Sequence, residues 1–255
     1  METLREQDLP LLNGGMEDGF RLVDGIGELD VAQNWHPWWD GNAARPEYKH
    51  AVYGLDMLRI HSGSHAQQWF STYNTHTAGI FQRVEGVTPG VEVHFEAWLQ
   101  CWSTDDDNPR LSRGRYRMRI GIDPYGGTDP ASDDIVWSND GHAIQPYDAY
   151  QRLEVSCETR ADRLTVFVWG QAEWALKHND AYVDDCRLWM LTDQPPEDPP
   201  EEPPEEPPEE PPQDPPEVVP STAELIETLY EGLDELASSI GELADRIAAL
   251  RGEGE

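Results

Sequence analysis

The chain has 255 residues, of which 50 are acidic and 18 are lysine or arginine, so its formal net charge at pH 7 is −32. A protein this acidic is repelled by phosphate backbones and by anionic membranes, which argues against nucleic acid as a partner. The length allows one medium domain with attachments, or two small domains.

Nothing in the sequence predicts insertion into a membrane. No stretch has the roughly 18 consecutive apolar residues of a membrane-spanning helix. The first residues, METLREQD, are charged and lack the apolar run of a secretory signal. We therefore expect no membrane insertion and no signal peptide in this chain, and a location on a virion or an extracellular surface.

Residues 1–193 are predicted to form a β-sandwich domain. Their apolar residues recur with period 2 in short runs that Gly, Pro, Asn and Asp separate. About eight or nine such strands with long polar connections predict a mainly β fold, an antiparallel sandwich of the jelly-roll kind. The predicted strands are 50–62, 66–72, 77–84, 91–102, 115–122, 150–157, 163–170 and 181–191.

The loop-like stretch NWHPWWDG is the first candidate ligand site. It holds Trp35, Trp38 and Trp39, followed by Asp40. A tryptophan in a loop can stack on the apolar face of a sugar ring while a neighbouring polar group binds its hydroxyls. The alternative is that these rings plug one end of the sandwich core.

The stretch GIDPYGGTDP is the second candidate, because it follows a predicted strand and loops on a rigid sandwich often carry binding residues. Tyr125 and Asp129 are its candidate contacts. The alternative is ordinary turn chemistry.

A carboxylate near each end of the domain is the candidate metal site. Strand alternation places Asp184 on the same face as Tyr182, Cys186 and Leu188, so its carboxylate should point inward. A buried carboxylate needs a partner, and a hard cation such as calcium is one. The alternative is that Asp184 caps neighbouring backbone N–H groups and that Glu17 is solvated.

The opening LLNGGMEDGF and the closing strand YVDDCRL resemble those of jelly-roll carbohydrate-binding modules, the galactose-binding-like folds attached to many secreted polysaccharide enzymes. The resemblance covers about residues 10–193. It implies a structural calcium held by the opening glutamate and the closing aspartate, here Glu17 and Asp184. Met16 stands where the family usually has an aromatic residue or leucine, and Cys186 stands where it has valine.

Residues 194–220 are predicted to be an acidic linker. Thirteen of residues 195–220 are proline and ten are acidic, in a PPEE repeat. Proline fixes φ and has no N–H, so a polyproline II rod is expected, and repulsion between the glutamates extends it. At about 3.1 Å per residue the linker could span roughly 80 Å.

Residues 221–251 are predicted to form a coiled-coil helix, followed by a tail at 252–255. Ser221 and Glu224 form a capping box at its start. The heptad pattern then runs unbroken, which favours self-association as a dimer or a trimer; docking on the chain's own domain is the alternative. The a and d positions are Ile226, Leu229, Leu233, Leu236, Ile240, Leu243, Ile247 and Leu250.

Together these parts predict a non-catalytic, multivalent protein that binds a polysaccharide or glycan surface, with its β-sandwich displayed on a rigid linker and gathered by a coiled coil. The alternative is a structural virion decoration, fibre or cell-surface protein that binds no glycan. A polysaccharide lyase or glycosidase is less expected, because the sequence has no GxSxG motif, P-loop or dinucleotide-binding fingerprint.

Overall fold

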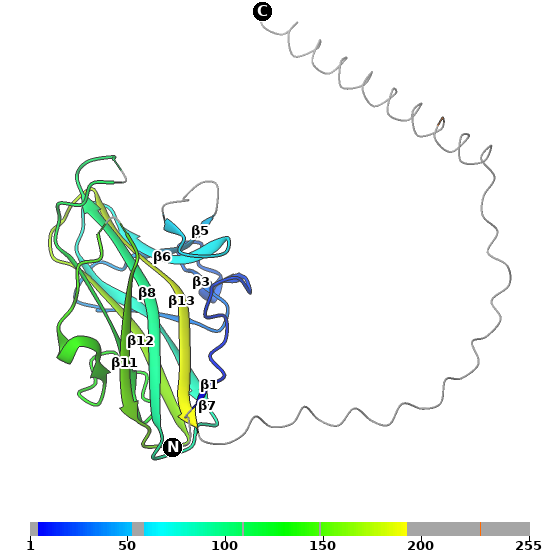
Figure 1. Cartoon of the computed structure of the whole chain (residues 1–255). Coiled ribbons are helices and arrows are strands. Elements are labelled where there is room, and N and C mark those ends of the chain that lie inside the picture. The colour runs from blue at the N-terminus through cyan, green and yellow to red at the C-terminus, as the bar shows by residue number, and fades with distance from the viewer. Residues whose placement is uncertain (1–4, 53–58, 109, 148, 193–229, 231–255) are drawn as a thin grey trace, which may run out of the picture. The chain divides into compact units, whose positions relative to one another are not determined.

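The computed structural model of the chain describes residues 5–52, 59–108, 110–147, 149–192 and 230 (Figure 1). The chain divides into two units, Met1–Pro195 and Pro196–Glu255. The predicted linker and all eight predicted heptad positions lie outside the described residues, so both stay predictions. No described helix is long and apolar enough to cross a membrane.

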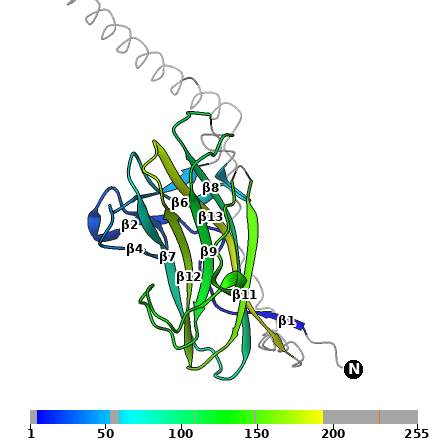
Figure 2. The ribbon, with the colours of Figure 1, turned by 90° about the vertical axis from the view of Figure 1, so that its left-hand side faces the viewer.

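The domain is built from two antiparallel sheets, which confirms the predicted mainly β sandwich (Figures 1 and 2). In what we call the first sheet the order is β11 (Gln151–Glu158), β8 (Glu92–Thr104), β13 (His178–Thr192), β6 (His65–Ser71) and β5 (Glu47–Val52), and β1 (Arg5–Asp8) also pairs with β13. In the second sheet it is β10 (Val136–Trp137), β9 (Tyr116–Asp123), β12 (Arg163–Ala172), β7 (His76–Glu85) and β4 (His36–Trp39).

Smaller elements connect the two sheets. Strands β2 (Phe20–Leu22) and β3 (Asp30–Ala32) form a ribbon of two strands. Short 3₁₀ helices follow β2 and β10, at Val23–Gly25 and Ser138–Gly141.

Strand alternation explains the core. Along β9, Tyr116, Met118, Ile120 and Ile122 are fully buried and belong to the main hydrophobic cluster, whereas the residues between them lie on the outer face. Strand β12 differs, because it is buried almost continuously from Leu164 to Val168. Leu164, Val166 and Val168 point into the core. Thr165 and Phe167 point to the outer face of the sheet but are also buried, so neighbouring side chains must cover them there.

The strand predicted at 50–62 was too long. Strand β5 ends at Val52, and the described residues 59–64 that precede β6 form no strand. Gly63 has a φ of +63°, the left-handed region that glycine favours and a strand excludes. Residues 59–64 instead approach β13, where Tyr150 Oη donates a hydrogen bond to the Arg59 carbonyl and Asp184 accepts from His61.

A buried histidine makes the stability of the domain depend on pH. The His76 side chain is 1% exposed, with Nδ1 2.8 Å from Ser71 Oγ and Nε2 2.7 Å from Tyr116 Oη. Burial lowers the pKa of His76 to about 3, from 6.5 in an exposed chain. Because the folded pKa is the lower one, this contribution to stability is present above pH 6.5 and is lost as the pH falls toward 3.

Between pH 6.5 and 5, we expect the wild type to lose about 2 kcal/mol of unfolding free energy relative to His76→Gln. Denaturant unfolding of both proteins at several pH values measures this difference. Asp180→Asn is the control of opposite sign, because burial raises the pKa of Asp180 to about 6 and its protonation stabilises the fold as the pH falls. Parallel pH profiles for wild type and His76→Gln would contradict the assignment.

Candidate functional site

The outer face of the second sheet carries a row of aromatic residues that crosses all five strands. Trp137 of β10 pairs with Gly121 of β9, which pairs with Phe167 of β12. Phe167 pairs with Phe81 of β7, and Phe81 with His36 of β4. Neighbouring rings are in contact: His36 stacks on Phe81 at 5.2 Å between centroids, and Phe81 lies 5.6 Å from Phe167.

A second row lies beside the first, one outward position along the strands. Arg119 of β9 pairs with Trp169 of β12, Trp169 with Gly79 of β7, and Gly79 with Trp38 of β4. None of these side chains belongs to the main core cluster, whose members on β12 are Leu164, Val166, Val168 and Ala172. Figure 2 shows β4, β7, β12 and β9 side by side in the sheet that carries both rows.

The two glycines in these rows let indole rings lie close to the sheet. A Cβ added to Gly121 would come within 2.7 Å of the Trp137 ring, and one added to Gly79 would lie 3.0 Å from Trp38 Nε1. A side chain at position 121 would therefore push the Trp137 indole away from the sheet. One at position 79 would also collide with the backbone of β12, because its Cβ would overlap the Val168 carbonyl oxygen. We name the aromatic and arginine side chains of the two rows the aromatic face: Trp137, Phe167, Phe81, His36, Arg119, Trp169 and Trp38.

Polar groups flank the aromatic face at the next outward positions. Arg117 of β9 donates to Gln171 Oε1 of β12 at 2.7 Å, and Gln171 Nε2 donates to Thr77 Oγ1 of β7 at 3.2 Å. Glu173 forms ion pairs with Arg117 at 2.5 Å and with Arg115 at 3.0 Å. The site therefore combines apolar ring surface with donors and acceptors at its border.

The outer face of the first sheet also carries aromatic side chains. There Ala51, Ala66 and Tyr182 form a second small core, against which Ile60, Trp102 and Tyr150 pack. The aromatic side chains of this face thus pack against the protein's own residues.

The stretch NWHPWWDG divides between core and surface. Trp35 is fully buried and donates to the Asn13 carbonyl at 3.0 Å, so as a ligand contact it is corrected to a core residue. Trp38 joins the aromatic face, although its indole is only 8% exposed. Trp39 packs against the core and lines a shallow hollow of about 700 Å³ with His36. Asp40 is exposed and accepts from the backbone N–H of Asn42 at 2.9 Å.

The second predicted site, Tyr125 and Asp129, lies in the loop after β9. Tyr125 is 51% exposed. Asp129 accepts from the backbone N–H of Ala131 at 2.9 Å, which is turn chemistry. Neither residue belongs to either row, so the structure does not unite the six predicted ligand contacts in one site.

Glu17 and Asp184 both bind the segment that precedes β6. Asp184 Oδ2 accepts from the backbone N–H of His61 at 3.0 Å and of Ser62 at 3.2 Å, and its Oδ1 accepts from Asp185 at 2.8 Å. Glu17 Oε1 accepts from Ser64 at 2.6 Å and His65 at 2.8 Å.

The predicted face of Asp184 was wrong, although its burial is confirmed. A β-bulge between Asp184 and Arg187 adds one residue to β13 opposite β8. Asp184, opposite Trp98, therefore lies on the outer face of the sheet, whereas Cys186 and Leu188 lie in the core. Burial raises the pKa of Asp184 to about 7.

The described geometry around these two carboxylates does not fit a calcium ion. A carboxylate has about four acceptor positions, and Asp184 uses three of them for backbone N–H groups. Calcium needs six to eight oxygen ligands, and no group of three or more His, Cys, Asp or Glu residues suited to a metal is found among the described residues. The calcium inferred from the resemblance stays an untested prediction.

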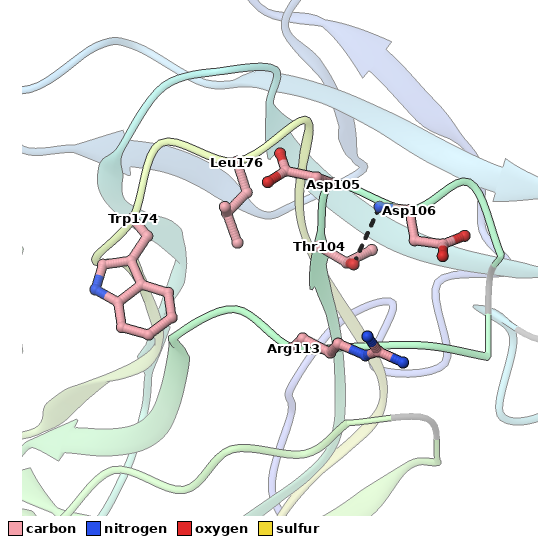
Figure 3. A pocket seen from close by; sticks show the side chains of 6 residues that line it. All are labelled: Thr104, Asp105, Asp106, Arg113, Trp174 and Leu176. Carbon is pink, nitrogen blue, oxygen red and sulfur yellow. Dashed lines mark hydrogen bonds between the residues drawn. The ribbon is translucent and has the colours of Figure 1, made fainter.

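A separate pocket of about 370 Å³ lies between the loop that follows β8 and the loop that precedes β13 (Figure 3). Its lining includes Trp174, which is 49% exposed, with Arg113 across from it. Asp105 accepts a hydrogen bond from the backbone N–H of Lys177 at 3.0 Å. One of the two acids that line the pocket is therefore bonded to the loop that precedes β13. The pocket offers a single ring, which is exposed. The aromatic face offers several rings, but they are half-buried or buried, apart from His36.

No protein-family model matches the chain, and no curated protein matches it. Several solved structures are similar to it. A family 61 carbohydrate-binding module in complex with beta-1,4-galactotriose has a TM-score of 0.47 and 15% identity, over 72% of this chain and 99% of that one. The enzymatically active domain of tailspike protein 4 of bacteriophage CBA120 has a TM-score of 0.42 and 10% identity, over 67% and 21%.

A family 4 carbohydrate-binding module has a TM-score of 0.38 and 13% identity, over 71% of this chain and 98% of that one. Carbohydrate-binding modules of families 61, 4 and 11 are thus among the structures that resemble this chain.

One feature of the sequence points to aromatic residues on the outer face of the second sheet, although strand alternation alone does not predict them. The run LTVFVW (164–169) is apolar at both odd and even positions, which is typical of a strand covered on both faces. In this run Phe167 and Trp169 alternate with core residues, so both side chains lie on the outer face of the second sheet. That Trp137 and Arg119 lie beside them depended on the strand order, which the run does not show.

Proposed function

We propose that this protein binds carbohydrate without catalysis, through the aromatic face. The observation that carries the proposal is the pair of adjacent rows in which Trp137, Trp169 and Trp38 lie on one side of a rigid sheet. Indole rings bind the apolar faces of sugar rings, and Arg117, Gln171 and Glu173 at the border can bind hydroxyl groups.

The dimensions of the aromatic face suit a chain of several sugars. Neighbouring strands lie about 4.8 Å apart, so a row across five strands extends about 19 Å. Because the rows run across the strands, from the half-buried Trp137 to the exposed His36, the ligand we propose is an internal stretch of a polysaccharide, lying across the strands.

We also propose that the C-terminal helix gathers several copies of the domain. The support is the unbroken heptad pattern from Ile226 to Leu250. Weak binding at each copy would then add up, because linked sites have a raised effective concentration.

A glycan array probed with the full chain tests the binding function. We expect retention on at least one class of polysaccharide, with no release of reducing ends or unsaturated sugars during incubation. An array of neutral and acidic polysaccharides that retains nothing would contradict glycan binding and favour a structural role. New reducing ends would contradict the absence of catalysis.

A further inference from the structure

Arg119 occupies an unusual position in the aromatic face. Its guanidinium carbon lies 4.0 Å from the centroid of the Trp137 ring and 4.7 Å from that of Trp169. Its Nη1 donates to the Gly141 carbonyl at 3.2 Å, and its buried Nε has no hydrogen-bond partner. The cation is thus held by two indoles and one backbone carbonyl at the β9 end of the second row.

The charge of Arg119 has no carboxylate to neutralise it among the described residues. Burial and the nearby Arg117 both lower the pKa of Arg119, and no acidic group acts in the other direction. Eight of the thirteen other described arginines differ in this respect. They lie within 4.0 Å of a carboxylate: Arg45, Arg83, Arg115, Arg117, Arg152, Arg160, Arg163 and Arg187.

Basic side chains gather at one end of this face. Arg115, Arg117 and Arg119 lie on or beside β9, and Glu173 pairs with the first two. At physiological salt the Debye length is about 8 Å, so distant acids are largely screened from a ligand that lies on the face. A nearby guanidinium then has more influence on the ligand than the net charge of −32.

Stacking leaves the edge of a guanidinium free for hydrogen bonds. In Arg119 Nε is buried and one N–H of Nη1 is used by Gly141, so Nη2 and the second N–H of Nη1 remain as donors. Cation–π contacts use the faces of the group, whereas hydrogen bonds use its edge. A planar fork of N–H donors matches the two oxygens of a carboxylate, or two oxygens of a sulfate ester, better than it matches a single hydroxyl.

Resting on the glycan-binding function proposed for this face, we infer that the preferred ligand is an anionic saccharide whose oxyanion group pairs with Arg119 while its rings lie against the neighbouring tryptophans. The shared chemistry is an oxyanion on a sugar ring. A uronic acid supplies it as a carboxylate and a sulfated sugar supplies it as a sulfate ester.

Matched pairs of polysaccharides test the inference on the full chain. Polygalacturonate, alginate and hyaluronate are each compared with their carboxyl-reduced forms, and a sulfated galactan with its desulfated form, by calorimetry at low salt. We expect at least one acidic polymer to bind about tenfold or more tightly than its neutral counterpart, with a preference that weakens as salt rises. The pair that shows the preference identifies carboxylate or sulfate as the group.

Variants of Arg119 test whether this side chain causes the preference for acidic polymers. Arg119→Gln should lower the affinity for the acidic polymer by a larger factor than that for the neutral one, and Arg119→Lys should keep part of the preference. Arg152→Gln is the matched control, because Arg152 lies on the other sheet and pairs with Glu96 and Glu154. The melting temperature of each variant checks that the fold is retained.

Three results would overturn the inference. Equal affinity for acidic and neutral forms would show that no anion is preferred. An equal loss of both in Arg119→Gln would show that Arg119 only positions the indoles. Binding to none of the polymers would contradict glycan binding itself, so this failure is distinct from the other two.

Discussion

Replacing Trp169 with alanine is expected to weaken glycan binding about 30-fold. Trp169 sits in the middle of the second row, between Arg119 and Gly79, where it can contact any ligand that crosses the sheet. Truncation of a central aromatic contact typically costs about 2 kcal/mol or more of binding free energy, and 1.4 kcal/mol corresponds to tenfold in affinity. Calorimetry with the polysaccharide retained on the array measures the change.

The fold should tolerate this substitution, because Trp169 lies on the outer face and is not part of the core cluster. Trp174→Ala is the matched control, since this tryptophan is more exposed and lines the pocket of Figure 3 instead. If Trp174→Ala abolished binding and Trp169→Ala did not, the ligand would bind in that pocket and the aromatic face would be the wrong site.

Replacing Leu236 and Leu243 together with glutamate should turn an oligomer into a monomer. Both are d positions of the predicted heptads. Each substituted layer of a bundle would therefore bury the glutamates of neighbouring helices together, with no positive charge to pair with them. Retention on a polysaccharide surface should fall by a factor on the order of 10² to 10⁴, because avidity is lost while each domain keeps its own site. Light scattering gives the molar mass, and surface-binding curves give the retention.

Glu235→Ala is the control for this pair, because it changes a c position on the outside of the helix. Affinity for a short, soluble oligosaccharide should be the same in all three proteins, since one domain binds it alone. A wild-type chain that is already a monomer would contradict the coiled-coil prediction, and the domains would then bind singly.

Local sequence patterns predicted most strands of the domain. Strands β8, β9, β11, β12 and β13 all fall on runs whose apolar residues alternate or continue, because a pleated strand presents successive side chains to opposite faces. The strand predicted at 50–62 was too long at its C-terminal end, where the described residues 59–62 lead into the polar turn at Gly63. The face of Asp184 was wrong because a single bulge reverses the alternation, and no local pattern indicates a bulge.

The candidate site was harder to predict, because its residues lie far apart along the chain. NWHPWWDG holds three tryptophans close together in the sequence, which predicts a shared site. In the fold, however, Trp35 lies in the core and Trp38 lies on the outer face of the second sheet. Residues of the aromatic face come from β4, β7, β9, β10 and β12, and they meet only because these strands pair in that order.

The sequence by itself determined that the domain is an antiparallel β-sandwich, because period-2 alternation depends only on neighbouring residues. It also determined that the chain is strongly acidic. Only the tertiary structure decided which aromatic side chains share a surface and which arginine stacks on two of them, because both depend on strand order and register. These follow from the packing of the whole domain, in which residues as far apart as Trp38 and Trp169 lie on one face of one sheet.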